Sequence, residues 1–63
     1  MPWTAEYYPA SMRRLAPRVR EKAIEIANAL LAEGMEEGKA IRIGIAKAKE
    51  WAVHHGLAPS NDD

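Results

Sequence analysis

The sequence lacks cysteine and phenylalanine, carries no excess of one charge, and has no long hydrophobic run. Without cysteine the chain offers no disulfide, no thiolate nucleophile and no sulfur-rich zinc site, and it is compatible with a reducing compartment. Charged residues recur every few positions between Arg13 and Glu50, so no stretch approaches the roughly 18 consecutive apolar residues of a membrane span. The first residues show no basic start followed by an apolar run, and we therefore expect a cytoplasmic protein.

The short length and the abundance of alanine predict one small all-α domain. The chain has 63 residues, of which twelve are alanine, the strongest helix former. A chain of this size buries only about 60% of the surface that its unfolded form exposes, so its hydrophobic core is thin. Because a second copy would supply further apolar contact, we expect a homodimer or another protein as the partner.

Two long helices are predicted after the irregular first part of the chain. Pro17 suits the first position of a helix, and Gly34 suits its end. Glu36 and Glu37 suit the start of a second helix, which we expect to run to about His55. Both segments repeat apolar residues at helical spacing. In the first segment the apolar stripe consists of Val19, Ala23, Ile24, Ile26, Ala27, Leu30 and Leu31.

The second helix carries a row of small residues at successive steps of four. Glycine in a helix interior costs roughly 0.5 to 1 kcal/mol relative to alanine, so close approach of a facing helix is the simplest compensation for Gly44. We expect an antiparallel hairpin in which Val19, Ile26 and Leu30 fill the groove, and a groove for a partner helix is the alternative. Residues 41–45 alternate as a strand would, but the continuous stripe favours a helix. The small residues are Ala40, Gly44, Ala48 and Ala52.

The first sixteen residues predict an aromatic arm with a short helical turn. Trp3, Tyr7 and Tyr8 lie in this segment, and burial of their rings would hold the arm against the helices. The carboxyl-terminal segment is short and polar, which is typical of a mobile chain end. We expect a single helical domain over residues 1–57 and a flexible tail over residues 58–63.

Several large apolar side chains are candidates for contact with a partner. Ile43 and Val53 fall outside the buried stripe of the second helix, so they point to solvent, to the arm or to a second chain. Trp51 lies at the edge of that stripe, where the stem of Lys47 and the amino-terminal arm are expected to cover its indole. If exposed, this tryptophan would mark an interface hot spot. The candidate interaction residues are Trp3, Tyr7, Tyr8, Ile43, Trp51 and Val53.

A basic segment supports an alternative, which is weak binding to nucleic acid. Five positive charges fall within ten residues, and the predicted helix, turn and helix also share the outline of a helix-turn-helix. The second helix, however, begins with Glu36 and Glu37, which phosphate repels, and the formal net charge is zero. The candidate nucleic-acid residues are Arg13, Arg14, Arg18, Arg20 and Lys22.

The residues predict no catalytic group, metal site or cofactor. The only aspartates are Asp62 and Asp63 in the tail, and Ser11 is better explained as the cap of the short turn than as a nucleophile. His54 and His55 are neighbours, so on a helix their rings diverge by about 100° and cannot share one metal ion. We therefore expect a non-catalytic protein-interaction module rather than an enzyme.

Five segments of the sequence carry a resemblance to a known family. They are MPWT (residues 1–4), YPASM (8–12), VREKAIEIANALL (19–31), EG (33–34) and AKAKEWA (46–52). They resemble the amino-terminal module of small uncharacterised bacterial proteins of the YdaT type. More loosely, the order of an aromatic after Met-Pro, Pro-x-Ser, Leu-x-Pro and two helices is similar to ChaB, a small helical protein named as a cation transport regulator. The resemblance implies a compact bacterial helical module with a stress-associated role, and it brings no catalytic residue with it.

Overall fold

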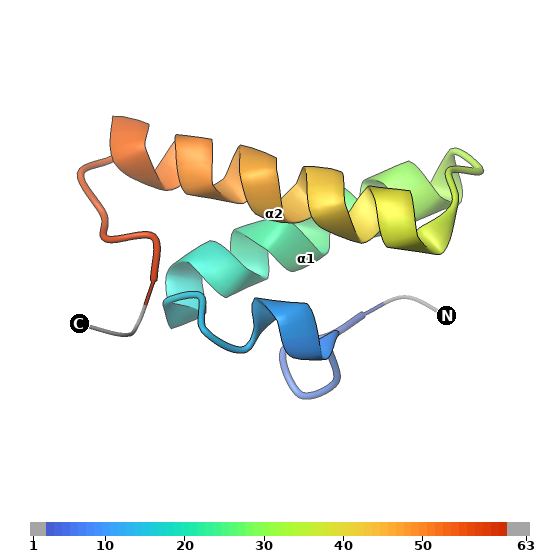
Figure 1. Ribbon diagram of the computed structural model, residues 1–63, viewed down its shortest axis with the longest axis horizontal. Coiled ribbons are helices and arrows are strands. Elements are labelled where there is room, and N and C mark those ends of the chain that lie inside the picture. Colours follow the sequence, from blue (N-terminus) through green and yellow to red (C-terminus); the bar gives the residue numbers. More distant parts are fainter. Residues whose placement is uncertain (1–2, 61–63) are drawn as a thin grey trace.

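The computed structural model describes residues 3–60 as two long antiparallel helices with an amino-terminal arm. A short 3₁₀ turn, η1 (Ala10–Met12), precedes α1 (Pro17–Ala32) and α2 (Glu37–His54). In Figure 1 α1 and α2 run side by side in opposite directions, and the arm lies along the other side of α1. No strand occurs among the described residues and residues 41–45 are helical, so the all-α prediction is confirmed.

Both long helices end in the same backbone arrangement. Gly34 follows α1 with a φ of 95°, and Gly56 follows α2 with a φ of 69°, in the left-handed region that glycine adopts without a Cβ penalty. The amide that follows each glycine donates to the carbonyl five residues earlier, at 3.1 and 2.8 Å respectively. These bonds satisfy carbonyls that would otherwise have no partner at a helix end. The two glycines therefore stop the helices where the sequence predicts.

The small residues of α2 form the contact with α1, as predicted. Gly44 lies so close to α1 that a Cβ at this position would be 2.9 Å from the carbonyl oxygen of Ala23 and 3.2 Å from the Cβ of Ala27. The residues of α1 nearest to Gly44 are Ala23 and Ala27, and not the larger side chains that were predicted there. Of those, Val19 is fully buried, whereas Ile26 and Leu30 are half-buried. Small residues on both helices bring the backbones together, and this leaves room for large side chains only at the edges of the interface. All four members of the row, Ala40, Gly44, Ala48 and Ala52, are buried.

The larger core side chains lie where the arm meets the helices. Met12 and Val19 are fully buried, and Leu15 is 2% exposed. Trp3 and Tyr8 pack half-buried against this cluster, so the arm folds over the helices and removes part of its aromatic surface from water. The core of buried residues consists of Met12, Leu15, Val19, Ala23, Ile24, Ala27, Ala48 and Ala52.

Backbone bonds, rather than the predicted serine cap, close the short turn of the arm. Pro9 is the residue before η1, its carbonyl accepts the amide of Met12 at 2.9 Å, and no side chain caps the turn. Ser11 lies inside η1 and is exposed, so its expected capping role is not observed. Thr4 plays the comparable part earlier in the arm, where its Oγ1 accepts the amide of Tyr7 at 3.0 Å.

The folded part of the chain continues beyond the predicted boundary at residue 57. The carbonyl of Pro59 accepts the amide of Ala16 at 3.3 Å, and Ser60 forms an isolated antiparallel bridge with Leu15. Figure 1 shows this segment turning back from the end of α2 toward the start of α1. The rest of the predicted flexible tail, residues 61–63, lies outside the described residues.

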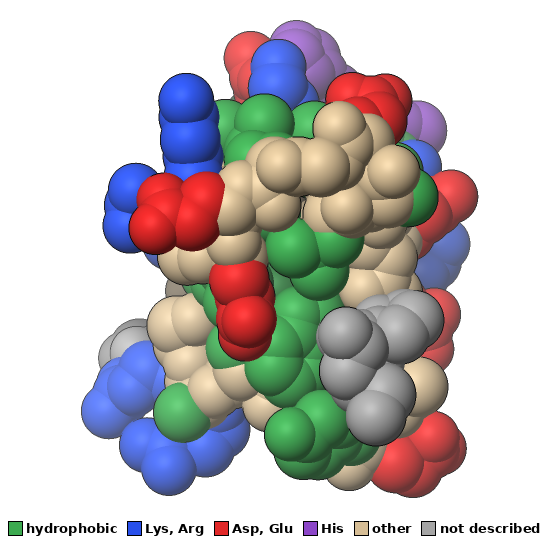
Figure 2. Space-filling model, turned by 90° about the vertical axis from the view of Figure 1, so that its right-hand side faces the viewer, with side chains coloured by type: hydrophobic (Ala, Val, Ile, Leu, Met, Phe, Trp, Pro, Cys, Tyr) green, Lys and Arg blue, Asp and Glu red, His purple; other side chains and the backbone are tan. Residues whose placement is uncertain are grey.

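The end of the molecule that carries the link between α1 and α2 keeps apolar surface in view. Figure 2 shows a band of hydrophobic side chains running across this end, with charged side chains mainly at its margins. Leu31 at the end of α1 and Met35 in the link are both half-buried. So small a chain cannot cover all of its apolar atoms, and we assign no binding role to this band at the link.

Candidate interaction site

Asn28 fastens the aromatic arm to α1. Its Oδ1 accepts the backbone amide of Trp3 at 2.8 Å, and its Nδ2 donates to the carbonyl of the same residue at 2.9 Å. The side-chain amide of Asn28 thus binds both main-chain polar groups of Trp3, as a neighbouring strand would in a sheet. The sequence alone did not predict this role. The available signal was a poor helix former in the middle of an otherwise strong helix.

Arg20 fastens the other end of the arm. Its guanidinium donates to the carbonyls of Met12, Arg13 and Leu15 at 3.1, 3.0 and 2.8 Å, and it also lies over the ring of Tyr8, 4.7 Å from the ring centroid. Met12 ends η1, and its carbonyl also accepts the amide of Leu15 at 3.2 Å. The fork of donors thus adds a partner for the carbonyl of Met12 and binds the carbonyls of Arg13 and Leu15 beyond the turn. Arg20 therefore has a structural role and is not available to contact phosphate.

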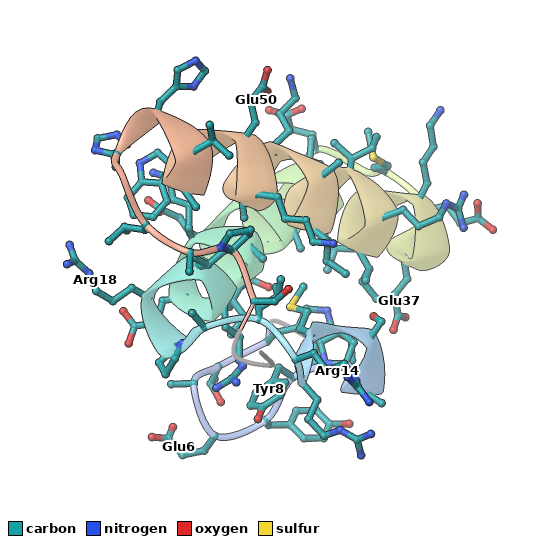
Figure 3. All side chains as sticks on the ribbon, turned by 60° about the vertical axis from the view of Figure 1, so that its left-hand side comes forward. Glu6, Tyr8, Arg14, Arg18, Glu37 and Glu50 are labelled. Carbon is teal, nitrogen blue, oxygen red and sulfur yellow. The ribbon has the colours of Figure 1, made fainter. Side chains whose placement is uncertain are left out.

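The remaining basic residues of the predicted nucleic-acid surface are also dispersed. Lys22 pairs with Glu25 at 3.4 Å on the exposed side of α1. Figure 3 shows Arg18 projecting outward at the start of α1, whereas Arg14 lies well apart from it on the side of the arm. Arg13 is exposed at the end of η1. The structure thus does not bring the five basic residues together into one surface.

Trp51 is contacted by two residues that were not predicted to meet it. It is half-buried, with the ammonium of Lys22 5.4 Å from its ring centroid and the ring of His55 at a centroid distance of 4.7 Å. The cation over the ring thus comes from α1, and the neighbouring ring belongs to the residue that follows α2. The contact predicted for the stem of Lys47 stays a prediction, and Lys47 itself is exposed. Trp51 also lines a shallow cleft of about 340 Å³ with Arg18, Glu21, Lys22 and Glu25. The two acidic and two basic side chains there leave this cleft without net charge.

A second, apolar pocket lies between the start of α1 and the segment after α2. Its volume is about 290 Å³, and Arg18 is the only charged residue in its lining. Such a space accommodates little more than one or two side chains. The lining residues are Ala16, Pro17, Arg18, Val19, Leu57 and Ala58.

The structure separates the candidate interaction residues into two groups. In the arm, Tyr7 is 60% exposed and its ring lies 5.2 Å from that of Trp3 between centroids. On α2, Val53 is 68% exposed and Ile43 is half-buried. Figure 1 places the arm and α2 on opposite sides of α1. A single flat partner therefore does not contact both groups at once.

Charged residues that were not among the predicted site residues surround the second group. Lys39, Arg42 and Lys49 are exposed on α2. Ala46 is also exposed and lies between Ile43 and Val53 on the same side of the helix. Glu50 also belongs to this side of the helix, and Figure 3 shows it pointing away from α1. The sequence signal for a charged side of α2 was the spacing of these three basic residues, with Arg42 three positions after Lys39 and seven before Lys49. We call the side of α2 opposite the buried row the outer face, and it comprises Lys39, Arg42, Ile43, Ala46, Lys49, Glu50 and Val53.

Two further features of residues 3–60 bear on function. No three histidine or acidic side chains within this part of the chain come together as a metal-binding group. Neither of its long helices has the length and apolar character needed to cross a bilayer.

The sequence is similar to uncharacterized protein YdaT of Bacillus subtilis (strain 168). The two are 60% identical over 52 residues, which make up 82% of this chain and 35% of the relative's length. The predicted resemblance to the YdaT type is thereby confirmed over that span, and the chain spans about a third of the relative it matches. The looser likeness to ChaB stays a prediction. No family model and no solved structure matches this sequence.

Proposed function

We propose that this chain is a non-catalytic helical module that binds another protein. The observation that carries the proposal is the row of Ile43, Ala46 and Val53 on the outer face of α2. A helix that packs only within its own domain has one apolar side, whereas α2 has the buried row and this second, narrower row. Spacings of three and seven residues are those with which a helix meets another helix.

The rigidity of the scaffold supports this function. Asn28 and Arg20 hold both ends of the arm, and the close contact at Gly44 holds the helices together. A preformed surface loses little conformational entropy when a partner binds, so a small apolar row suffices for recognition. The proposal places the module in the cytoplasm, in keeping with a sequence without cysteine. A stress-associated role, which the resemblance to the YdaT type implied, stays part of this proposal.

Site-specific photo-crosslinking tests the function. A benzophenone amino acid replaces Val53 in one variant and Ser11 in another, because both positions are exposed but only the first lies on α2. In cells that naturally express the chain, we expect a discrete adduct from position 53 and none from position 11. Equal, diffuse labelling from both positions would contradict the proposal.

The mass of the adduct identifies the form that the interaction takes. An adduct of twice the mass of the chain indicates self-association, and light scattering over a dilution series then checks for a homodimer. An adduct of another mass indicates a different protein. If scattering shows a strict monomer and the crosslink gives a discrete adduct, the proposed binding of another protein is supported and the homodimer is rejected.

A further inference from the structure

We infer that the outer face of α2 binds an acidic amphipathic helix of a different protein. This inference rests on the proposed function and adds to it the chemistry of the partner. Two properties of the outer face carry it, namely the length of its apolar row and the sign of the charges beside that row.

The apolar row matches the contact surface of one helix. Ile43 and Val53 are ten residues apart, which at the helical rise corresponds to about 15 Å or nearly three turns. Ala46 lies between them and offers little side chain, so a facing helix can approach there while its larger apolar residues pack beside Ile43 and Val53. None of the three residues belongs to the buried core cluster: Ile43 is half-buried, and Ala46 and Val53 are exposed.

The charges along and beside the row are mostly positive. At 3.6 residues per turn Lys39 and Glu50 lie on the line of the row itself, and Arg42 and Lys49 lie along one side of it. Lys39, Arg42 and Lys49 are exposed, and among residues 3–60 none of the three makes an ion pair or a side-chain hydrogen bond. The guanidinium of Arg42 extends toward the first turn of α2, where its Nη1 would be 3.7 Å from a Cβ at Gly38. Glu50 is the one acidic residue of the outer face. Charge complementarity at such flanking positions favours a partner whose own flanks are acidic.

The same charges oppose a second copy of this chain as the occupant. If two outer faces met in antiparallel orientation around Ile43 and Ala46, Arg42 would lie opposite Lys49 of the second copy. In parallel orientation Arg42 would lie opposite Lys47 of the second copy. Like charges at these positions are destabilising in either arrangement. A homodimer, if the chain forms one, therefore uses another surface.

Nucleic acid and lipid fit the outer face less well than a protein helix. Ile43, Ala46 and Val53 occupy the centre of the face, where a phosphate backbone would need donors, and the chain has no net charge to attract it. A helix that binds a membrane surface buries a broad apolar side by about 5 to 10 Å. The broad apolar side of α2 is already packed against α1.

A designed peptide provides the probe for this inference. The acidic probe is a helical peptide of about three heptads, with leucine and alanine along one seam and glutamate at the flanking positions. The matched probe carries lysine in place of each glutamate. Binding of both to the full chain is followed by ¹H–¹⁵N NMR titration. We expect the acidic probe to shift the amides of residues 39–53 and to bind at least about tenfold more tightly than the lysine probe.

Charge-reversal variants show which residues bind the probe. In the double variant Arg42→Glu and Lys49→Glu, we expect the preference to invert, so that the lysine probe binds better. The control variant, Arg13→Glu and Arg18→Glu, has the same change in net charge at exposed positions away from the outer face, and we expect its preference to remain that of the original chain. In Val53→Ser both probes should bind more weakly. The amide spectrum of each variant confirms that it is folded.

Three results overturn the inference. The first is equal binding of the two probes, or no binding of either. The second is the same loss in the control variant, which would mean that net charge alone matters. The third is tighter binding of the outer face to duplex DNA or to phosphatidylglycerol vesicles. If a discrete crosslink from position 53 persists under any of these results, the proposed function stands and only the acidic partner is rejected.

Discussion

The backbone of Gly44 in α2 lies against the carbonyl oxygen of Ala23 in α1, so that a Cβ at position 44 would be 2.9 Å from that oxygen. Real Cβ atoms do not approach a backbone oxygen so closely. The nearest obstacle is main chain rather than a flexible side chain, so the two helices would have to separate to admit even one methyl group. This contact therefore sets the distance between α1 and α2.

We predict that Gly44→Ala lowers the free energy of unfolding by about 1 to 3 kcal/mol, although alanine is the better helix former. Chemical denaturation followed by circular dichroism measures the change. Gly38→Ala is the matched control in the same helix, because a Cβ there meets nothing nearer than 3.7 Å. It should leave stability unchanged or raise it by up to about 1 kcal/mol. Equal effects of the two substitutions would disprove the close-contact account.

A second prediction concerns the attachment of the arm at Asn28. Replacing it with alanine leaves the amide and carbonyl of Trp3 without their partners, which should lower the free energy of unfolding by about 1 to 3 kcal/mol. In a Trp51→Phe background, Trp3 is the single tryptophan, and its emission should shift to the red as the arm loosens. Asn28→Asp keeps the acceptor for the amide of Trp3 but loses the donor to its carbonyl. We therefore expect it to show at least part of the loss in free energy of unfolding that Asn28→Ala shows. An unshifted emission maximum in Asn28→Ala would contradict the role of the side chain.

A third prediction compares two arginines of the basic segment. Arg20→Lys keeps the charge but loses the planar fork that binds three carbonyls, and we expect a loss of about 1 to 2 kcal/mol in the free energy of unfolding. Arg13→Lys, at an exposed position, should change stability by no more than about 0.5 kcal/mol. Thermal melting of both variants at high and low salt provides the comparison. Equal midpoints for the two variants would reject a special role for Arg20.

Local patterns in the sequence predicted the helices well. Pro17, Gly34 and Gly56 mark helix ends through backbone conformations that depend on a few neighbouring residues. The row that contains Gly44 indicated the buried side of α2, because helical spacing alone places its members on one side. The partner of that row was predicted less well. Periodicity shows which residues of a helix are buried, but it does not show which side chains of another helix meet them.

The side chains that attach the arm could not be predicted by the same reasoning. Residue type and spacing do not distinguish Asn28 from other polar residues of α1, and they group Arg20 with the basic segment. Each finds its partner through the tertiary fold, Asn28 at Trp3 and Arg20 at the carbonyls of Met12 and Leu15. The covering of Trp51 by Lys22 follows from the distance between the two helices, which no local pattern contains.

The amino-acid sequence by itself determined where this chain forms helices, where they end and which side of each is apolar, since these properties depend on dihedral preferences and on the repeat of a few turns. Only the tertiary structure decided how near α1 and α2 approach, which polar side chains hold the arm, and which part of α2 stays exposed. Those outcomes depend on the simultaneous packing of segments far apart in the chain, where the volume of one side chain limits the position of another.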